Sequence, residues 1–280
     1  MGEIAKDGTT DHGAVTDKDS PEGKEAWMKN LLEAYRRGEL TAEEVEERMM
    51  RMLYDEGEEF LLDLHRGKRI GFPEVVFAEG KSEEQLLAIT GSLFAKNGHV
   101  FISTIDETKE RLVRDAFPGA EIRKAGRIMA LKKQDLRDEG LGCVGIITAG
   151  TADAPYAQEC ALILEEIGAE VIMSIDLGAS GMHRPLLGLK KARGADLLIV
   201  FAGMDGVLPT LMGSLTDQPI IAVPTPVGYG FGGGGMAALS TMLQCCVPGV
   251  LVVNIGNTVG AAGAAIRILK AMKRGKGEQA

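Results

Sequence analysis

Two adjacent thiols, Cys245 and Cys246, follow a run of glycines at residues 232–235. They lie in a segment from residue 218 to residue 277 that contains neither Asp nor Glu. A helix terminus, flexible backbone amides and absent carboxylates all favour the thiolate form of a nucleophilic cysteine. Free cysteine is also among the residues most often buried, and composition alone favours simple packing for this pair. The segment is therefore a candidate for covalent chemistry on an anion, with packing as the alternative.

Further candidates follow short apolar runs in the second half of the chain, which predict strands at 144–148, 170–175, 196–201, 219–223 and 250–254. Each run ends in glycine together with Thr, Asp, His, Arg or Asn. Such loops can form a phosphate cradle, although the same residues also serve as ordinary helix caps. The candidate residues are Thr148, Gly150, Thr151, Asp153, Asp176, His183, Arg184, Gly203, Asp205, Gly206, Gly228, Tyr229, Gly230 and Asn254.

The alternation of these strands with helix-like segments predicts an α/β fold, a three-layer doubly wound parallel sheet of the flavodoxin-like type. In such a sheet ligands bind beyond the carboxyl ends of the strands, where the candidate residues lie. Gly228, Gly230 and Gly233 formally match GxGxxG. The pattern follows the fourth predicted strand, and no acid follows it until Glu278, which argues against a dinucleotide fingerprint. We interpret it as a flexible loop that closes over a ligand.

The first half of the chain predicts a small helical and α/β module. A helix is expected at 26–39, and a second begins at Thr41 with Glu44 three residues on, a capping box. Strands at 75–77 and 100–103 flank a helix at 82–96. The predicted organisation is a disordered leader at 1–25, an N-terminal module at 26–138, an α/β domain at 139–272 and a flexible tail at 273–280.

Composition excludes several classes of protein. The chain has 280 residues, 45% of them hydrophobic, which suffices for one large or two modest domains. A net charge of −9 argues against a nucleic-acid partner but leaves small anionic substrates open. Four cysteines without a CxxC pair form neither a disulfide framework nor a zinc knuckle. With no signal peptide and no apolar run long enough for a bilayer, we expect a cytoplasmic protein without a membrane partner.

The motifs TAGTAD, GASGMHRP, AGMDGVLP, AVPTPVGYG, CCVPG and NIGN, in this order, resemble the LarB family, the carboxylases that begin nickel-pincer nucleotide synthesis. The stretch DLHRGKRIGFPEVVFAEGK at 63–81 is similar to the N-terminal tract of that family. The second half is more distantly similar to PurE, the aminoimidazole ribonucleotide carboxylase or mutase. PurE proteins generally lack the N-terminal module and the Cys-Val-Pro-Gly. The resemblance is therefore to LarB, with a PurE-like C-terminal domain.

This resemblance implies that nicotinic acid adenine dinucleotide is carboxylated on its ring, with carbon dioxide as co-substrate. Hydrolysis of its phosphoanhydride then gives AMP and pyridinium-3,5-biscarboxylic acid mononucleotide. Cys246 would be the nucleophile and Cys245 a packing neighbour. Asp205 stands where the family usually has Glu and would be the general base on the ring carbon.

The resemblance also implies binding roles and an assembly. Thr148, Gly150, Thr151 and Asp153 would hold phosphate or ribose, and His183 with Arg184 would neutralise a phosphate or a substrate carboxylate. No organic cofactor is expected. Mg²⁺ or another divalent ion often assists phosphoanhydride hydrolysis, but no spacing identifies metal ligands. The assembly implied is a homo-oligomer, an octamer built from the second domain.

Two alternatives remain open at this stage. One is a PurE-like carboxylase or mutase acting on aminoimidazole ribonucleotide, which would need the His and the phosphate loop but no thiol. The other is a non-catalytic dinucleotide-binding protein. The chain has Gly256, Thr258 and Val259 where the LarB family typically has Asp, Gly and Phe, and these departures bear on substrate choice.

Overall fold

The computed structural model describes residues 21–56, 61–63, 66, 70–133 and 140–277. The chain divides into two compact units, Met1–Asp55 and Glu56–Ala280. The predicted leader at 1–25 lies mostly outside the described residues, and the predicted tail at 273–280 does so in part. The domain boundaries expected near residues 138 and 272 stay predictions.

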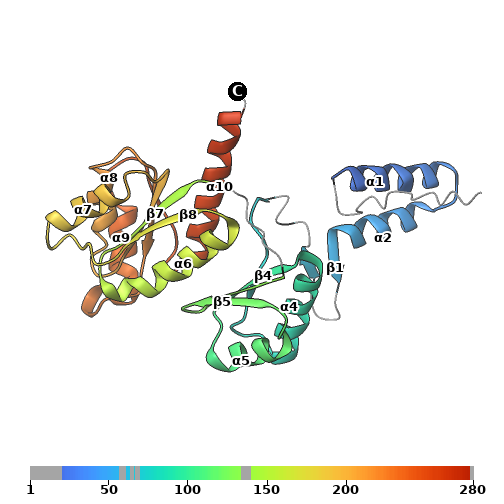
Figure 1. The fold of residues 1–280 in the computed structure, drawn as a ribbon, viewed down its shortest axis with the longest axis horizontal. Helices are drawn as coiled ribbons and strands as arrows, with labels where there is room; N and C mark the ends of the chain where they lie inside the picture. Colours follow the sequence, from blue (N-terminus) through green and yellow to red (C-terminus); the bar gives the residue numbers. More distant parts are fainter. Residues whose placement is uncertain (1–20, 57–60, 64–65, 67–69, 134–139, 278–280) are drawn as a thin grey trace, which may run out of the picture. The chain divides into compact units, whose positions relative to one another are not determined.

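The first unit contains two helices, α1 (Pro21–Arg36) and α2 (Ala42–Leu53), which contact each other (Figure 1). The capping box expected before the second helix is present. The Thr41 amide donates to Oε2 of Glu44 at 2.8 Å, and the Glu44 amide donates to Oγ1 of Thr41 at 3.2 Å. These bonds satisfy amides that have no partner within the helix, which explains why α2 begins here.

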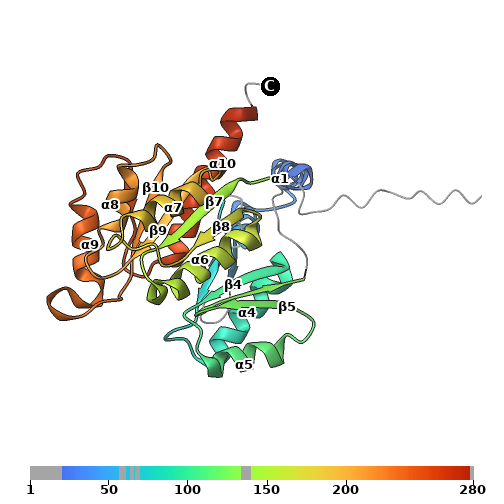
Figure 2. The ribbon, with the colours of Figure 1, turned by 60° about the vertical axis from the view of Figure 1, so that its left-hand side comes forward.

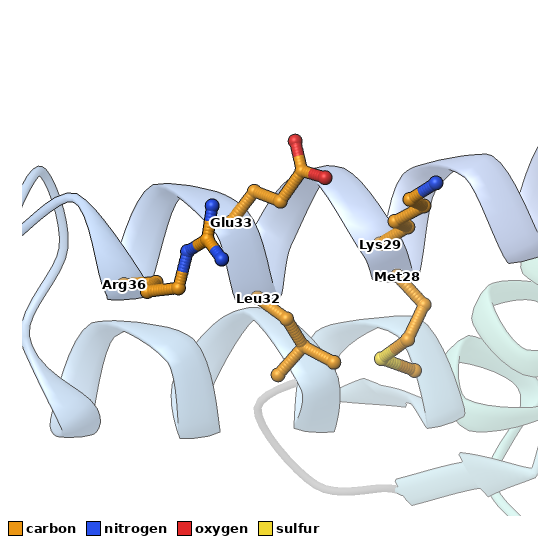
Figure 3. Close-up of a pocket in the computed structure, with 5 residues that line it drawn as sticks. All are labelled: Met28, Lys29, Leu32, Glu33 and Arg36. Carbon is orange, nitrogen blue, oxygen red and sulfur yellow. The ribbon is translucent and has the colours of Figure 1, made fainter.

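A shallow pocket of about 410 Å³ lies on the surface of α1. Its lining residues are Met28, Lys29, Leu32, Glu33 and Arg36, all from this one helix (Figure 3). Figure 3 shows the apolar Met28 and Leu32 on one side of the helix and Glu33 on the other. This is the side-chain pattern of an amphipathic helix, and it brings no nucleophile and base together.

In the second unit, a four-stranded sheet has the order β3 (Val75–Phe77), β4 (His99–Ser103), β6 (Ile128–Lys132), β5 (Glu121–Ala125). Strand β3 runs parallel to β4, whereas β6 is antiparallel to both of its neighbours. Helices α4 (Glu83–Asn97) and α5 (Glu107–Ala116) bury an apolar cluster against this sheet. Two short strands, β1 (Tyr54–Glu56) and β2 (Leu61–Asp63), form a separate two-stranded sheet.

The five-stranded sheet is parallel throughout and has the order β11 (Val250–Val252), β10 (Ile220–Pro224), β9 (Leu197–Ala202), β7 (Cys143–Thr148), β8 (Glu170–Ser174). Counted along the chain from its first strand, this is the flavodoxin-like order of a doubly wound sheet. All residues of β9 and β10 are buried, as expected for strands covered on both faces. The predicted fold class is confirmed.

Helices cover both faces of the parallel sheet (Figures 1 and 2). One apolar cluster involves α6 (Ala154–Ile167) and α10 (Thr258–Gly277), and the other involves α7 (His183–Lys191), α8 (Leu208–Gly213) and α9 (Met236–Leu243). Two short 3₁₀ turns, η1 (Thr151–Asp153) and η2 (Gly230–Gly235), lie in loops. Helix α6 also contacts β5 and β6, so the two sheets share one core. In the part of the chain that the structure describes, no helix is long and apolar enough to cross a membrane.

Charged side chains are buried where α6 meets the four-stranded sheet. Glu166 of α6 accepts a hydrogen bond from Nη1 of Arg123 at 2.7 Å and lies 3.5 Å from Nζ of Lys132. Its other neighbour is Nε2 of His99, at 3.9 Å. The side chains of Glu166 and Lys132 are 1% and 7% exposed. Since a buried charge is tolerated only when it is paired, each partner of this cluster supports the others.

The buried His99 predicts a loss of stability in acid. Among the described residues neither ring nitrogen has a hydrogen-bond partner, and burial, opposed by Glu166 and assisted by Lys132, lowers the pKa of His99 from 6.5 to about 4. Between these pH values the unfolded chain binds a proton that the folded chain does not. The free energy of unfolding should therefore fall as pH drops below 6.5, by about 2 kcal/mol at pH 5.

This expectation is checked by urea unfolding at pH 7 and pH 5. A His99→Phe variant should lose much less stability on acidification than the wild type, because its ring cannot be protonated. The matched control is His183→Gln, which alters an exposed histidine and should keep the wild-type acid loss. An equal loss in wild type and His99→Phe would contradict the assignment.

Candidate active site

The candidate site lies beyond the carboxyl ends of β7, β9 and β10. Strand β8 flanks β7 on one side and β9 flanks it on the other, so the direction of winding reverses between β7 and β9. At such a switch point the loops of the two strands diverge and leave room for a ligand. The loops that follow these strands carry most of the residues expected from the sequence.

Asp153 ties these loops together. Its side chain is buried, with 2% of the residue exposed, and Oδ2 accepts a hydrogen bond from the Gly150 amide at 2.8 Å. Oδ1 accepts a hydrogen bond from Oγ1 of Thr225, in the loop after β10, at 2.5 Å. Burial raises the pKa of Asp153, while hydrogen bonds from Thr225 and from the amides of Gly150 and Gly203 act in the opposite direction. The carboxyl group thus joins the loops after β7, β9 and β10.

Thr148, at the end of β7, is also buried and faces the neighbouring loop. Its hydroxyl donates to the carbonyl of Gly150 at 2.9 Å and accepts from the amide of Asp176 at 3.2 Å. Thr151, by contrast, is exposed at the start of the turn before α6. Of the expected phosphate-binding residues, Thr151 is therefore accessible, whereas Thr148, Asp153 and the Gly150 backbone bond to one another and hold the loop in shape.

The loop after β8 brings Asp176 and Arg184 together. Asp176 has φ of 63°, a left-handed conformation that is uncommon outside glycine. Nη1 of Arg184 lies 3.5 Å from its Oδ2, and both side chains are about half exposed. His183 is exposed at the first residue of α7. The Arg and His expected to meet an anion are thus accessible, and Arg184 already has one carboxylate neighbour.

The loop after β9 is packed tightly and presents Asp205 to solvent. A Cβ on Gly203 would lie 2.2 Å from the carbonyl oxygen of Val227, so only glycine fits. Gly206 has φ of 66° and packs against the backbone of Ala238 in α9, which again excludes a side chain. Oδ1 of the exposed Asp205 accepts a hydrogen bond from the Val207 amide at 3.3 Å. The carboxylate therefore lies on a rigid turn at the rim of the site.

The glycine-rich loop after β10 exposes two aromatic side chains. Tyr229 is 81% exposed and Phe231 is fully exposed. Gly228 and Gly230 on either side of Tyr229 have φ of 151° and 68°. The loop follows the fourth strand of the parallel sheet, so it does not occupy the first strand-to-helix turn that a dinucleotide fingerprint requires. Its closure over a ligand stays a prediction.

The two cysteines differ in their surroundings. Sγ of Cys245 accepts hydrogen bonds from Oγ1 of Thr210 at 3.2 Å and from the Val247 amide at 3.4 Å. Cys246 is exposed, and among the described residues its thiol has no hydrogen-bond partner. Both lie between α9 and β11 rather than in a loop that follows a strand. Thr210 belongs to α8, which begins three residues after Asp205, and this contact links the cysteine segment to the Asp205 turn.

The remaining expected residue, Asn254, follows β11. It is exposed, and its Oδ1 accepts a hydrogen bond from the Ile255 amide at 2.9 Å. Over the described residues, no group of three or more His, Cys, Asp or Glu side chains could hold a metal ion.

Sequence reasoning did not single out Thr225, which bonds to Asp153 across 72 positions of the chain. Its place between two prolines directly after a strand was the available signal. It also did not identify Glu159 and Arg127, because their proximity depends on the packing of α6 against the four-stranded sheet.

Comparison with known proteins matches both parts of the second unit. Residues 54–134 match the model of the LarB/PurE-like N-terminal domain, and residues 143–278 match that of AIR carboxylase. An uncharacterized protein of Methanocaldococcus jannaschii is 37% identical over 256 residues, covering 88% of this chain and 98% of the relative. The chain belongs to the LarB family, and its C-terminal domain is PurE-like.

Other relatives align with a smaller share of the LarB-family chain. The N5-carboxyaminoimidazole ribonucleotide mutase of Pyrococcus horikoshii is 35% identical over 130 residues, which cover 45% of the chain and 71% of the mutase. The corresponding mutase of Methanocaldococcus jannaschii is 34% identical over 113 residues, or 40% of the chain and 67% of that mutase. The chain thus also has mutase relatives, and each of these two alignments covers less than half of it.

Proposed function

We propose that this LarB-family chain carboxylates the pyridinium ring of nicotinic acid adenine dinucleotide and hydrolyses its phosphoanhydride. The products would be AMP and pyridinium-3,5-biscarboxylic acid mononucleotide, an intermediate of nickel-pincer nucleotide synthesis. The observation that carries this proposal is the joining of a LarB/PurE-like N-terminal domain to an AIR carboxylase domain in one chain. The exposed thiol of Cys246 supports it, because the reaction requires an accessible nucleophile.

The chemistry follows from the electron demand of the ring. A pyridinium ring is electrophilic and does not attack carbon dioxide. The Cys246 thiolate adds to the carbon para to the ring nitrogen, and the electron pair moves onto nitrogen to give a dihydropyridine. The free meta carbon of this enamine attacks carbon dioxide. Asp205 removes the proton from that carbon, and expulsion of the thiolate restores the aromatic ring.

In the hydrolytic step, water attacks phosphorus and AMP leaves with the bridging oxygen. Thr151 is the accessible residue of this loop for a phosphate, and His183 with Arg184 would meet a second anionic group. Mg²⁺ or another divalent ion carried by the diphosphate of the substrate remains part of the proposal. So does a homo-oligomer, which the exposed Leu186 and Leu187 of α7 and Leu243 of α9 support as apolar surface.

The test is mass spectrometry of the protein incubated with nicotinic acid adenine dinucleotide, magnesium and labelled bicarbonate. The expected result is AMP together with a mononucleotide that carries one labelled carboxylate. Binding of the dinucleotide without either product would contradict the proposal and favour a dinucleotide-binding protein. A thermal shift on addition of the dinucleotide measures that binding independently.

A PurE-like carboxylase or mutase reaction is the second candidate function. The similarity of 40–45% of the chain to proteins named N5-carboxyaminoimidazole ribonucleotide mutase favours it. This reaction needs no thiol and no N-terminal domain. Turnover of an aminoimidazole ribonucleotide, unaffected by loss of Cys246, would therefore support it over the ring carboxylase.

A further inference from the structure

A cavity of about 360 Å³ opens where the N-terminal domain of the second unit meets the PurE-like domain. Residues from both family domains line it: Phe72, Phe77 and Arg127 from the first, and Glu159, Asn257 and Thr258 from the second. It lies at the carboxyl ends of the parallel pair β3 and β4 and at the first residues of α10. None of the residues assigned to the catalytic crevice lines it, although Asn254 precedes its wall by only two residues.

One part of the cavity wall is suited to a phosphate. Arg66 and Arg127 are among its lining residues, and Nε of Arg66 is buried without a hydrogen-bond partner among the residues that the structure describes. Nη1 of Arg66 lies 3.6 Å from Glu74, and its side chain remains 43% exposed. Arg127 is exposed. The positive end of the α10 dipole adds to these cations, because Thr258 and Val259 begin that helix at the cavity.

Another part is suited to a flat ring. Phe72 and Phe77 line the cavity together with the aliphatic Val75 and Ile128. Phe77 is 51% exposed although it belongs to a strand of the sheet, so its ring is available for stacking. Offset stacking on an aromatic side chain is a common way to hold a nucleobase. It can hold any base, because every base has a flat π-face.

A buried carboxyl group lies at the cavity. Glu159 of α6 is 8% exposed, and Oε1 accepts a hydrogen bond from the Arg127 amide at 2.8 Å. Oε2 accepts a hydrogen bond from the hydroxyl of Thr258 at 3.1 Å. Each carboxylate oxygen has a second lone pair, so Glu159 can still accept from a neutral hydroxyl such as that of a ribose. A second phosphate beside it would be repelled.

We propose that this cavity binds the nucleoside monophosphate half of the dinucleotide, that is, the adenylate part that leaves as AMP. The inference rests on the proposed function. The mutase relatives, whose names specify a ribonucleotide, align with about 45% of the chain, which corresponds in length to the PurE-like domain. A dinucleotide has one nucleotide more, and the N-terminal domain contributes the cations and aromatic rings of a cavity whose carboxyl group, Glu159, belongs to the PurE-like domain.

The test is calorimetric titration of the full chain with AMP and, separately, with nicotinic acid mononucleotide, without bicarbonate. Replacement of Arg127 by alanine should weaken AMP binding by about tenfold or more, since it removes a charged hydrogen-bond donor. Its backbone bonds to Glu159 and Ile105 remain, so the fold is kept. The affinity for nicotinic acid mononucleotide should not change. The matched control is Arg111→Ala, which removes an exposed arginine of α5 and should alter neither affinity.

Equal AMP affinity in wild type and Arg127→Ala would overturn the inference. So would loss of AMP binding in Arg184→Ala but not in Arg127→Ala, because AMP would then occupy the catalytic crevice. Both measurements are made without turnover, so they do not depend on the chemistry of the ring. AMP binding that needs Arg127, in a protein that yields no carboxylated product, would leave the cavity assigned and contradict the proposed function instead.

Discussion

Replacement of Cys246 by serine is expected to lower ring carboxylation by about a thousandfold or more, because loss of a covalent nucleophile removes the whole reaction path. A serine hydroxyl is a far weaker nucleophile than a thiolate at neutral pH. The fold should be unaffected, since Cys246 is exposed and its thiol forms no hydrogen bond in the described part of the chain. Mass spectrometry with labelled bicarbonate measures the effect as loss of the labelled mononucleotide.

The neighbouring cysteine provides the matched control. A Cys245→Ser variant keeps a side chain that can bond to Thr210 and to the Val247 amide, so it should retain activity within a few-fold of wild type. If Cys246→Ser carboxylates as fast as wild type, the covalent mechanism is wrong. If Cys245→Ser loses carboxylation and Cys246→Ser keeps it, Cys245, whose thiol bonds to Thr210, is the nucleophile. The assignment by resemblance is then wrong.

Replacement of Glu166 by alanine is expected to destabilise the protein by about 3–5 kcal/mol, the cost of breaking a buried ion pair by removal of one partner. The side chain of Glu166 is 1% exposed and pairs with Arg123 at 2.7 Å and Lys132 at 3.5 Å. Its removal leaves the positive charges of Arg123 and Lys132 with less opposite charge nearby, at the contact between α6 and the four-stranded sheet. Urea unfolding at pH 7 measures the change.

The adjacent Glu165 offers a control on the same helix. Its side chain is 41% exposed and lies 2.6 Å from Nη2 of the same arginine, Arg123. A partly exposed pair contributes about 1 kcal/mol or less, so Glu165→Ala should be nearly neutral. Equal effects of the two replacements would show that burial does not decide the strength of this cluster.

We assign the two halves of the proposed substrate to binding sites in different parts of the chain. In the proposed reaction the ring half would require Cys246 and Asp205, whereas we assign the adenylate half to the cavity that Arg127 and Glu159 line. Under this proposal the N-terminal domain of the LarB family would contribute to binding of the adenylate half, a role for which the similarity to mutases gives no explanation.

Several features followed from local patterns in the sequence. The strands of the parallel sheet were predicted because each is a short run that is apolar on both faces, and β7 to β10 lie within a residue or two of the expected ranges. The capping box at Thr41 and Glu44 was predicted because its two hydrogen bonds join residues three positions apart. The choice of Cys246 as nucleophile, by contrast, came from the family resemblance and stays a prediction.

Only the tertiary structure decided which distant residues meet. Asp153 appeared to be a ligand for phosphate or ribose, yet its carboxyl group is buried and bonds to Thr225, 72 positions away. Arg127 and Glu159 meet only because α6 packs against two sheets at once. Sequence periodicity reports which face of a strand or helix is apolar, and so it determined the elements and the loops at their ends. The pairing of those loops depends on strand order and on long-range packing, which no local pattern encodes.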